Sequence, residues 1–153
     1  MQIEIRPNTD LFTVDADAIA HGCNCLGVMG AGVALQVKIR YPEVYQSYKD
    51  YVKRMNYSKD ILPGTAQCIE TEDKTIFNLF TQYEMGRHAK AEYIAGAFAE
   101  MFGIAQLSHI STIAIPMIGA GIGGMKWEDV LLAIEQAENA MPWNGTLIIA
   151  IKD

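Results

Sequence analysis

Hydrophobic and polar residues change their spacing along the chain in a way that predicts alternating strands and helices. Apolar residues recur with the period of a helix in four segments, which cover residues 32–40, 43–55, 89–107 and 127–141. Alternating patterns or short apolar runs predict six strands, which cover residues 2–6, 18–24, 65–70, 75–80, 112–116 and 147–151. Proline, glycine and small polar residues separate many of these segments, as is usual at turns.

The order of these segments predicts an α/β fold. Strands and helices alternate, and a hairpin over residues 65–80 interrupts the alternation. This order is typical of a three-layer α/β/α domain around a central mixed sheet. The 153 residues are enough to bury a core, and no linker or repeat divides them, so we expect one domain over residues 1–153.

Net charge narrows the classes of partner. The chain has 18 acidic and 12 basic residues, a net charge of −6, and its basic residues are scattered. Nucleic-acid binding depends on clustered cations that neutralise phosphates, so we expect no nucleic-acid partner. No apolar run reaches the length of a membrane span, and residues 2–6 read as a strand rather than a signal peptide. We therefore expect a cytoplasmic protein without a membrane partner.

The three cysteines, Cys23, Cys25 and Cys68, are an odd number in a chain without a secretion signal. This predicts free thiols rather than a disulfide framework. No pair of histidine and cysteine residues has the spacing of zinc ligands, so we expect neither a metal nor another cofactor.

Two glycine-rich segments are the strongest functional signal. Residues 29–34 (MGAGVA) follow one predicted strand and open a helix, and residues 118–124 (IGAGIGG) follow another strand. Bare backbone amides and a helix N-terminus form a ready anion site in such a setting. Two such loops predict a ligand with more than one phosphate, bound by backbone amides on an acidic protein.

Common nucleotide-binding motifs do not explain these loops. The first loop lacks the third glycine of the dinucleotide-binding fingerprint, and two helices follow it where a strand ending in an acidic residue is required. The Gly-Lys-Ser/Thr sequence of the phosphate-binding P-loop is absent from the chain.

Asn24 and His21 are candidates for chemistry because they lie at the end of a buried strand, directly before the first glycine loop. The Asn24 amide suits a ribose hydroxyl or a positioned water, although asparagine also closes local turns. His21 has a near-neutral pKa that suits a general acid or base. It reaches the same face as Asn24 only if the strand bends at Gly22, and the alternative is a histidine satisfied within the core.

Two further loops carry polar candidates. Asp10 lies in a turn after the first strand, where it either caps the turn or accepts hydrogen bonds from an exocyclic amine, with Phe12 near a base. Residues 81–88 form a polar loop after a buried strand, and its Thr81, Gln82 and Arg87 are candidate ligand contacts. The planar fork of Arg87 suits a terminal phosphate.

With these residues in place, the chain resembles the macro domain family of ADP-ribose-binding modules over nearly its whole length. The segments that carry the resemblance are residues 9–19, 21–25 with 29–34, and 115–124. The resemblance implies that Asp10 holds the adenine amine, that the second loop wraps the diphosphate, and that Asn24 and the first loop contact the distal ribose. The residues that it assigns to ligand binding are Asp10, Leu11, Met29, Gly30, Ala31, Gly32, Val33, Ile118, Gly119, Ala120, Gly121, Ile122, Gly123 and Gly124.

Within the family, the run at residues 21–25, the Tyr41-Pro42 pair and residues 79–81 look most like the small stand-alone phosphatases that act on ADP-ribose-1''-phosphate. The resemblance thus implies a metal-independent phosphatase in which His21 is the general acid or base and Asn24 positions the ribose and a water. The alternatives are a non-catalytic reader of ADP-ribose or of ADP-ribosylated protein, a hydrolase of protein-linked ADP-ribose, and a deacetylase of O-acetyl-ADP-ribose. The branch that performs the last two reactions uses a lysine and an aspartate. Here Gly123 takes the corresponding loop position, and no aspartate lies between it and Trp127.

Overall fold

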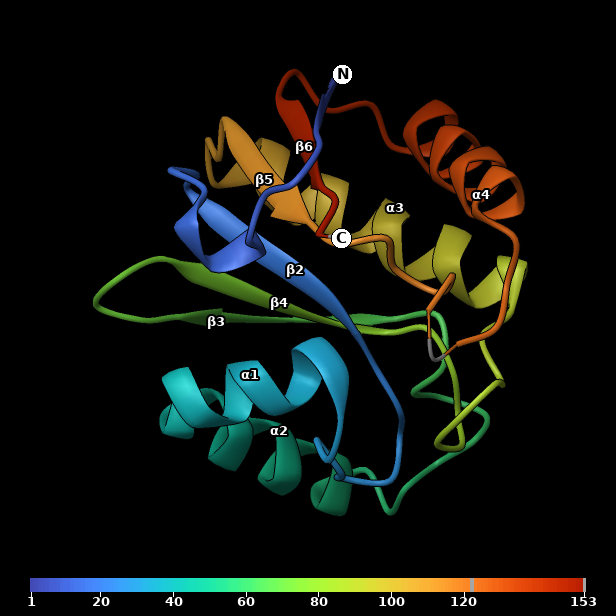
Figure 1. Cartoon of the computed structure of the whole chain (residues 1–153). Coiled ribbons are helices and arrows are strands. Elements are labelled where there is room, and N and C mark those ends of the chain that lie inside the picture. Colours follow the sequence, from blue (N-terminus) through green and yellow to red (C-terminus); the bar gives the residue numbers. More distant parts are fainter. Residues whose placement is uncertain (122, 153) are drawn as a thin grey trace.

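The computed structural model describes residues 1–121 and 123–152. Within them, the strands are β1 (Gln2–Arg6), β2 (Ala18–Cys23), β3 (Ala66–Glu70), β4 (Thr75–Phe80), β5 (Thr112–Ile115) and β6 (Thr146–Ala150). The α-helices are α1 (Gly32–Arg40), α2 (Pro42–Arg54), α3 (Ala91–Leu107) and α4 (Trp127–Ala140), and a 3-10 turn, η1, covers Leu11–Thr13. Figure 1 shows α1 and α2 on one side of the sheet and α3 and α4 on the other, which confirms the three-layer α/β/α prediction.

The sheet is mixed, with the strand order β1-β6-β5-β2-β4-β3. Every neighbouring pair is parallel except β3 and β4, which form the predicted hairpin. Because five strands run the same way, the carboxyl ends of β2, β4, β5 and β6 meet at one edge of the sheet. That edge is where ligands bind in open α/β sheets.

Two hydrophobic clusters bury the two faces of the sheet. The face toward α3 and α4 includes Ala20, Leu79 and Ile149, and the face toward α1 and α2 includes Ile19 and Phe80. Neighbouring residues of a strand therefore belong to opposite clusters, as strand geometry requires. The central strands thus pack against hydrophobic residues on both faces.

Helix boundaries follow local signals in the sequence. Pro42 occupies the first turn of α2, where its missing N–H costs nothing, and Tyr41 ends α1. Helix α3 begins at Ala91 and not at Ala89 as predicted, because Lys90 is extended, with φ of −129° and ψ of 142°.

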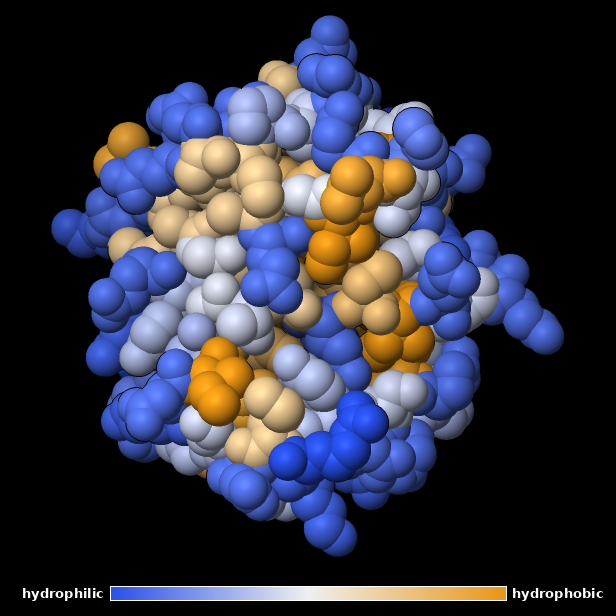
Figure 2. All heavy atoms as spheres, turned by 180° about the vertical axis from the view of Figure 1, so that it is seen from behind, coloured by the Kyte–Doolittle hydropathy of each residue, from blue (hydrophilic) through white to orange (hydrophobic). Residues whose placement is uncertain are grey.

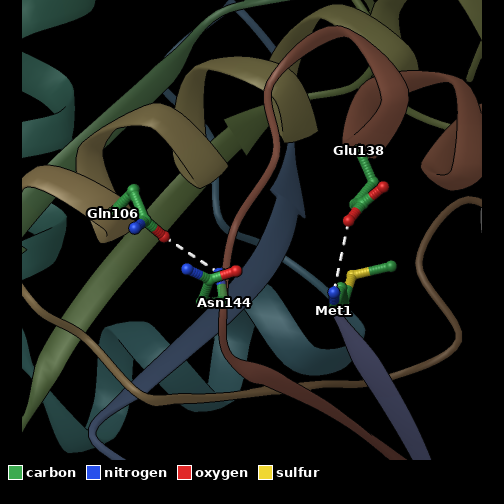
Figure 3. Close-up of polar contacts among 4 residues, drawn as sticks. All are labelled: Met1, Gln106, Glu138 and Asn144. Carbon is green, nitrogen blue, oxygen red and sulfur yellow. Dashed lines mark hydrogen bonds and ion pairs between the residues drawn. The ribbon is translucent and has the colours of Figure 1, made fainter.

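Polar contacts connect the N-terminus and the turn before β6 to α4 and α3 (Figure 3). The backbone N–H of Asn144, just before β6, donates to Oε1 of Gln106 on α3 at 2.9 Å. The amine of Met1 pairs with Oε1 of Glu138 on α4 at 3.2 Å. Buried Trp143 stacks on Phe102 with ring centroids 5.5 Å apart, so the turn before β6 is fixed by packing as well as by hydrogen bonds.

Seen from behind, the molecule has a largely hydrophilic rim, and hydrophobic residues gather in separate patches nearer the centre of that face (Figure 2). Among the described residues, no helix is long and apolar enough to cross a membrane.

Candidate functional site

Two adjoining cavities open at the carboxyl edge of the sheet, each with a volume of about 490 Å³. They share four lining residues, which are Gly32, Val33, Pro116 and Met117. The first cavity extends from these residues toward the ends of β2 and β4, and the second extends toward η1 and the end of β6. Together they form one elongated cleft, which suits a long ligand better than a compact one.

The N-terminus of α1 lies between the two cavities. Residues 31–34 line the first cavity, and Gly32 and Val33 also line the second. The N-cap residue, Ala31, has no side chain that can cap the helix, and the first turn has no acidic residue. The first amides of a helix have no partner within it, so these amides and the positive end of the helix dipole are directed at the cleft. This arrangement favours an anion at the N-terminus of α1.

The second glycine loop closes on itself opposite α1. The N–H of Met125 donates to the carbonyl of Gly119 at 2.8 Å, and Gly119 has a φ of +79°. A side chain at Gly119 would meet Ile94 at 2.8 Å, and one at Gly123 would meet the Gly119 carbonyl at 2.8 Å. Packing therefore explains these two glycines. At Gly121, which lines the first cavity, a Cβ would meet nothing within 4 Å, so its glycine leaves open space in the cleft.

Asn24 lines the first cavity and also organises the loop that follows β2. Its Oδ1 accepts from the N–H of Leu26 at 3.0 Å and from the hydroxyl of Tyr48 at 2.8 Å. Its Nδ2 donates to the carbonyl of Val28 at 2.8 Å, which uses one of its two amide hydrogens. Asn24 thus does what the turn interpretation expects, and its second amide hydrogen has no partner among the hydrogen bonds of the described residues.

The second cavity combines a carboxylate, an aromatic ring and two cations. Oδ1 of Asp10 accepts from the N–H of Phe12 at 3.0 Å, which caps η1. Oδ2 of Asp10 lies 3.8 Å from Nζ of Lys152, and the Arg40 guanidinium lies 4.5 Å from the centre of the Phe12 ring. Gln36, one turn before Arg40 on α1, completes the polar lining. This cavity offers an aromatic surface beside a hydrogen-bond acceptor.

The structure does not support His21 as a general acid or base. The side chain is fully buried and does not line either cavity. Strand β2 does not bend at Gly22, so His21 lies between Ile19 and Cys23 on the α1–α2 face and within the sheet. The expected acid–base role is therefore corrected to that of a histidine satisfied within the core.

A buried hydrogen-bond chain explains why a histidine is tolerated there. Nε2 of His21 lies 2.6 Å from Oδ1 of Asn78 on β4, and Nδ2 of Asn78 donates to Oε1 of Gln67 on β3 at 3.1 Å. Gln67 donates in turn to the carbonyl of Ser47 on α2. Because Asn78 accepts through Oδ1, His21 carries its proton on Nε2. Burial lowers the pKa of His21 to about 4, and the Asn78 contact only partly offsets this, so the ring is neutral near pH 7.

Among the described residues that line the first cavity, the one titratable side chain is Cys23. Burial raises the pKa of its thiol well above the usual value, so the thiol stays protonated near pH 7. The first cavity is therefore neutral, and its polar character comes from backbone amides, Asn24, Thr81 and Gln82.

Most of the residues that the sequence assigned to a ligand meet at this cleft. Those that line it are Asp10, Leu11, Asn24, Gly30, Ala31, Gly32, Val33, Thr81, Gln82, Ile118, Gly119, Gly121 and Gly123. Those that do not are Met29, which is buried in the core, and Ala120, Gly124 and Arg87. Arg87 is exposed and packs against Gly124, whose Cβ would meet its Nε at 2.9 Å. Ile122 lies outside the described residues.

Sequence reasoning missed several lining residues. Arg40 is at the last position of α1, and Lys152 follows β6, which the pairing with β1 brings toward η1. Met85 and Val28 border the first cavity as exposed apolar side chains, and no motif marked them. No local sequence pattern links these two basic residues to Asp10, because both lie far from it along the chain.

The buried His21 makes stability depend on pH. Between about 6.5 and 4 an exposed imidazole of the unfolded chain takes up a proton, whereas the folded one stays neutral. The unfolded state then binds more protons, so the free energy of unfolding falls as the pH drops through this range. The full effect is about 3 kcal/mol. Urea unfolding at pH 7 and at pH 4 gives the free energy of unfolding that is lost between the two. We expect this loss to be smaller in His21→Gln than in the wild-type protein by about this amount.

The control for that comparison is His88→Gln, because His88 is exposed in the loop after β4. It should keep the pH dependence of the wild-type protein. Equal pH dependence in His21→Gln and the wild type would contradict the lowered pKa of His21.

The hydroxyl of buried Tyr48 connects α2 to the Asn24 loop, with 2.8 Å contacts to both the backbone oxygen and Oδ1 of Asn24. We expect Tyr48→Phe to lower the free energy of unfolding by about 1 kcal/mol, since the hydrogen bonds from the hydroxyl to Asn24 are lost. Tyr51→Phe is the matched control, because Tyr51 also packs on Phe80. Urea unfolding checks both variants, and an equal effect in the two would contradict a special role for the Tyr48 hydroxyl.

Comparison with known proteins shows the family to which this chain is related. Residues 20–134 match the family described as Macro domain. A DNA ADP-ribosyl glycohydrolase of Mycobacterium tuberculosis is 33% identical over 135 residues, which cover 87% of this chain and 38% of that relative. The chain thus spans well under half of that relative's length. An ADP-ribose 1''-phosphate phosphatase of Meyerozyma guilliermondii is 26% identical, with 78% of this chain and 85% of that protein covered.

Solved structures agree with the family match. The structure described as the macrodomain of Mycobacterium tuberculosis DarG superimposes with a TM-score of 0.82, at 30% identity and 97% coverage of both chains. The family match covers most of the chain, and the fold is shared over nearly all of it. The chain belongs to the Macro domain family.

Proposed function

We propose that the elongated cleft binds ADP-ribose and that the chain hydrolyses the phosphate ester of ADP-ribose-1''-phosphate. The observation that carries the binding proposal is the uncapped N-terminus of α1 between two cavities of equal volume. A diphosphate needs an anion site in its middle, and a nucleoside and a second ribose need space on either side. The names of the relatives, which refer to ADP-ribose and to ADP-ribosyl groups, support this ligand.

Each part of the ligand has a matching part of the cleft. The adenine occupies the second cavity, with Phe12 beside it and Asp10 as an acceptor for its amine. The diphosphate lies over the amides of residues 32–34, which are already in place and need no reorganisation. The distal ribose occupies the first cavity, near the free N–H of Asn24.

The neutral first cavity favours a substrate that brings its own base. A phosphate monoester dianion can take the proton of an attacking water, and phosphoryl transfer asks the protein mainly for positioning and charge stabilisation. In the reaction that we propose, the water oxygen attacks phosphorus and the bond from phosphorus to the 1'' oxygen breaks. The water proton passes to the phosphate group and on to the leaving oxygen, so the products are ADP-ribose and inorganic phosphate. The amides of residues 32–34 and the Asn24 N–H orient the ligand.

Sequence similarity favours a second candidate, the removal of ADP-ribose from DNA. The chain is 33% identical to the Mycobacterium tuberculosis glycohydrolase but 26% identical to the Meyerozyma phosphatase. The net charge of −6 argues against broad binding of a DNA backbone, but recognition of the attached ADP-ribose requires only the cleft. The exposed side chains of Val28 and Met85 border the first cavity, where the attached group would emerge.

Parallel turnover assays separate these candidates. We expect multiple turnovers of phosphate release from ADP-ribose-1''-phosphate, and no release of ADP-ribose from a modified single-stranded oligonucleotide. The reverse result would establish the glycohydrolase and overturn the phosphatase. Binding of ADP-ribose by calorimetry without turnover of either substrate would contradict a hydrolase and leave a reader of ADP-ribose. His21→Gln should retain activity, since its imidazole does not reach the cleft.

A carboxylate placed at Ala31 tests the anion site with opposite effects on stability and binding. Ala31 is an extended, exposed N-cap residue with φ of −154°. Aspartate there caps the helix and favours its dipole, so Ala31→Asp should raise the free energy of unfolding by roughly 0.5–1 kcal/mol. The same charge repels the diphosphate and occupies the amides, so ADP-ribose affinity should fall at least about tenfold.

The control for this charge is Lys90→Asp, at the N-cap of α3. That helix also lacks a side-chain cap, and Lys90 does not line the cleft. Calorimetric titration with ADP-ribose should show wild-type affinity for Lys90→Asp. Unchanged affinity in Ala31→Asp would show that the α1 amides do not bind the diphosphate.

A further inference from the structure

Two basic side chains line the second cavity, although binding of an uncharged adenine does not require a positive charge. Arg40 and Lys152 line it beside a single carboxylate, Asp10, in a protein whose net charge is −6. The first cavity, by contrast, has no charged side chain among its described lining residues. The basic groups are thus concentrated at the end of the cleft that we assign to the adenosine.

Arg40 is held in place with its donors free. Its guanidinium lies 4.5 Å from the centre of the Phe12 ring, within the range of a cation–π contact. Among the ion pairs of the described residues, none includes Arg40, and the side-chain hydrogen bonds found in that part of the chain do not involve it. A guanidinium with unpaired N–H groups is suited to a phosphate, which accepts two parallel hydrogen bonds.

Lys152 approaches the same cavity from the segment after β6. Its Nζ lies 3.8 Å from Oδ2 of Asp10, and its side chain is 73% exposed. The other oxygen of Asp10 is engaged by the N–H of Phe12. One contact with a carboxylate leaves the three-donor ammonium able to reach a second anion at the mouth of the cavity.

The position of Arg40 suits the adenosine end of the cleft better than the diphosphate. Arg40 is at the last position of α1, whereas the free amides are at residues 32–34. At the rise of an α-helix, the ends of this segment are roughly 12 Å apart. The guanidinium of Arg40 lies over the Phe12 ring of η1, in the part of the cleft that we assign to the adenosine.

We propose that the second cavity binds a phosphate monoester on the adenosine ribose, so that the cleft prefers ADP-ribose 2'-phosphate to ADP-ribose. This inference rests on the proposed binding of ADP-ribose and adds the class of ligand. Arg40 contacts the added phosphate with its N–H edge, and Lys152 contributes a second charge. An arginine near the adenosine ribose serves this purpose in other dinucleotide sites, where it accommodates a 2'-phosphate.

Purely structural roles for the two cations make a different prediction. Arg40 lies in the last turn of α1, where a cation favours the helix dipole, but Lys38 is in that turn as well. Lys152 pairs with Asp10. If these were their only roles, their removal would affect stability, or the binding of both ligands equally, and would not change the ratio of the two affinities.

Calorimetric titration with ADP-ribose and with ADP-ribose 2'-phosphate tests the proposal. We expect the wild-type protein to bind the 2'-phosphate form roughly tenfold more tightly, since a charge-assisted contact is gained. Arg40→Gln and Lys152→Gln should each reduce this ratio, Arg40→Gln to near one. The ratio should also fall as salt rises, because the contact is exposed.

The matched control is Arg54→Gln. Its guanidinium also lies over an aromatic ring, that of Tyr51 at 5.9 Å, but it does not line either part of the cleft. It should keep the wild-type ratio. Equal wild-type affinity for the two nucleotides, or an unchanged ratio in Arg40→Gln, would overturn the preference while leaving ADP-ribose binding intact. If neither nucleotide binds, the proposed function itself fails and this inference with it.

Discussion

The parallel alignment of β2, β4, β5 and β6 is the constraint on which the rest of the structure depends. It brings the ends of four strands to one edge, and the segments that leave those ends become the walls of the cleft. Hydrophobic clusters on both faces hold this alignment, because each central strand gives alternate residues to α1–α2 and to α3–α4. The cleft is therefore a consequence of core packing, and the site requires few side chains of its own.

This origin explains why the site is polar without being charged at its centre. The helix N-terminus supplies positive potential through amides that the fold has already oriented, and a side-chain cap would have removed it. Among the described lining residues, charged groups appear only at the far end, where Arg40 and Lys152 lie near Asp10. An acidic protein can thus present an anion site without a basic surface, which reconciles a net charge of −6 with a phosphate ligand.

Much of the fold could be predicted because its signals are local. The apolar runs of β5 and β6, the break at Pro42 and the hairpin of β3 and β4 each depend on a few neighbouring residues. The glycine loops were found for the same reason. What could not be predicted depends on contacts between distant segments. His21 was mistaken for a catalyst because its partner Asn78 lies 57 residues away on β4. Lys152 was overlooked because only the β1–β6 pairing brings it to Asp10.

The most direct measurement of the central claim is an NMR titration of the amide-labelled protein with ADP-ribose. The account predicts saturable shifts of the amide resonances of Gly32, Val33 and Ala34, as expected where helix N-terminal amides bind a phosphate. The amide of Gly121 should shift with the same midpoint, and that of Lys90, at an N-cap outside the cleft, should not. Binding with shifts confined to residues outside the cleft, or the absence of saturable shifts at residues 32–34, would contradict the account.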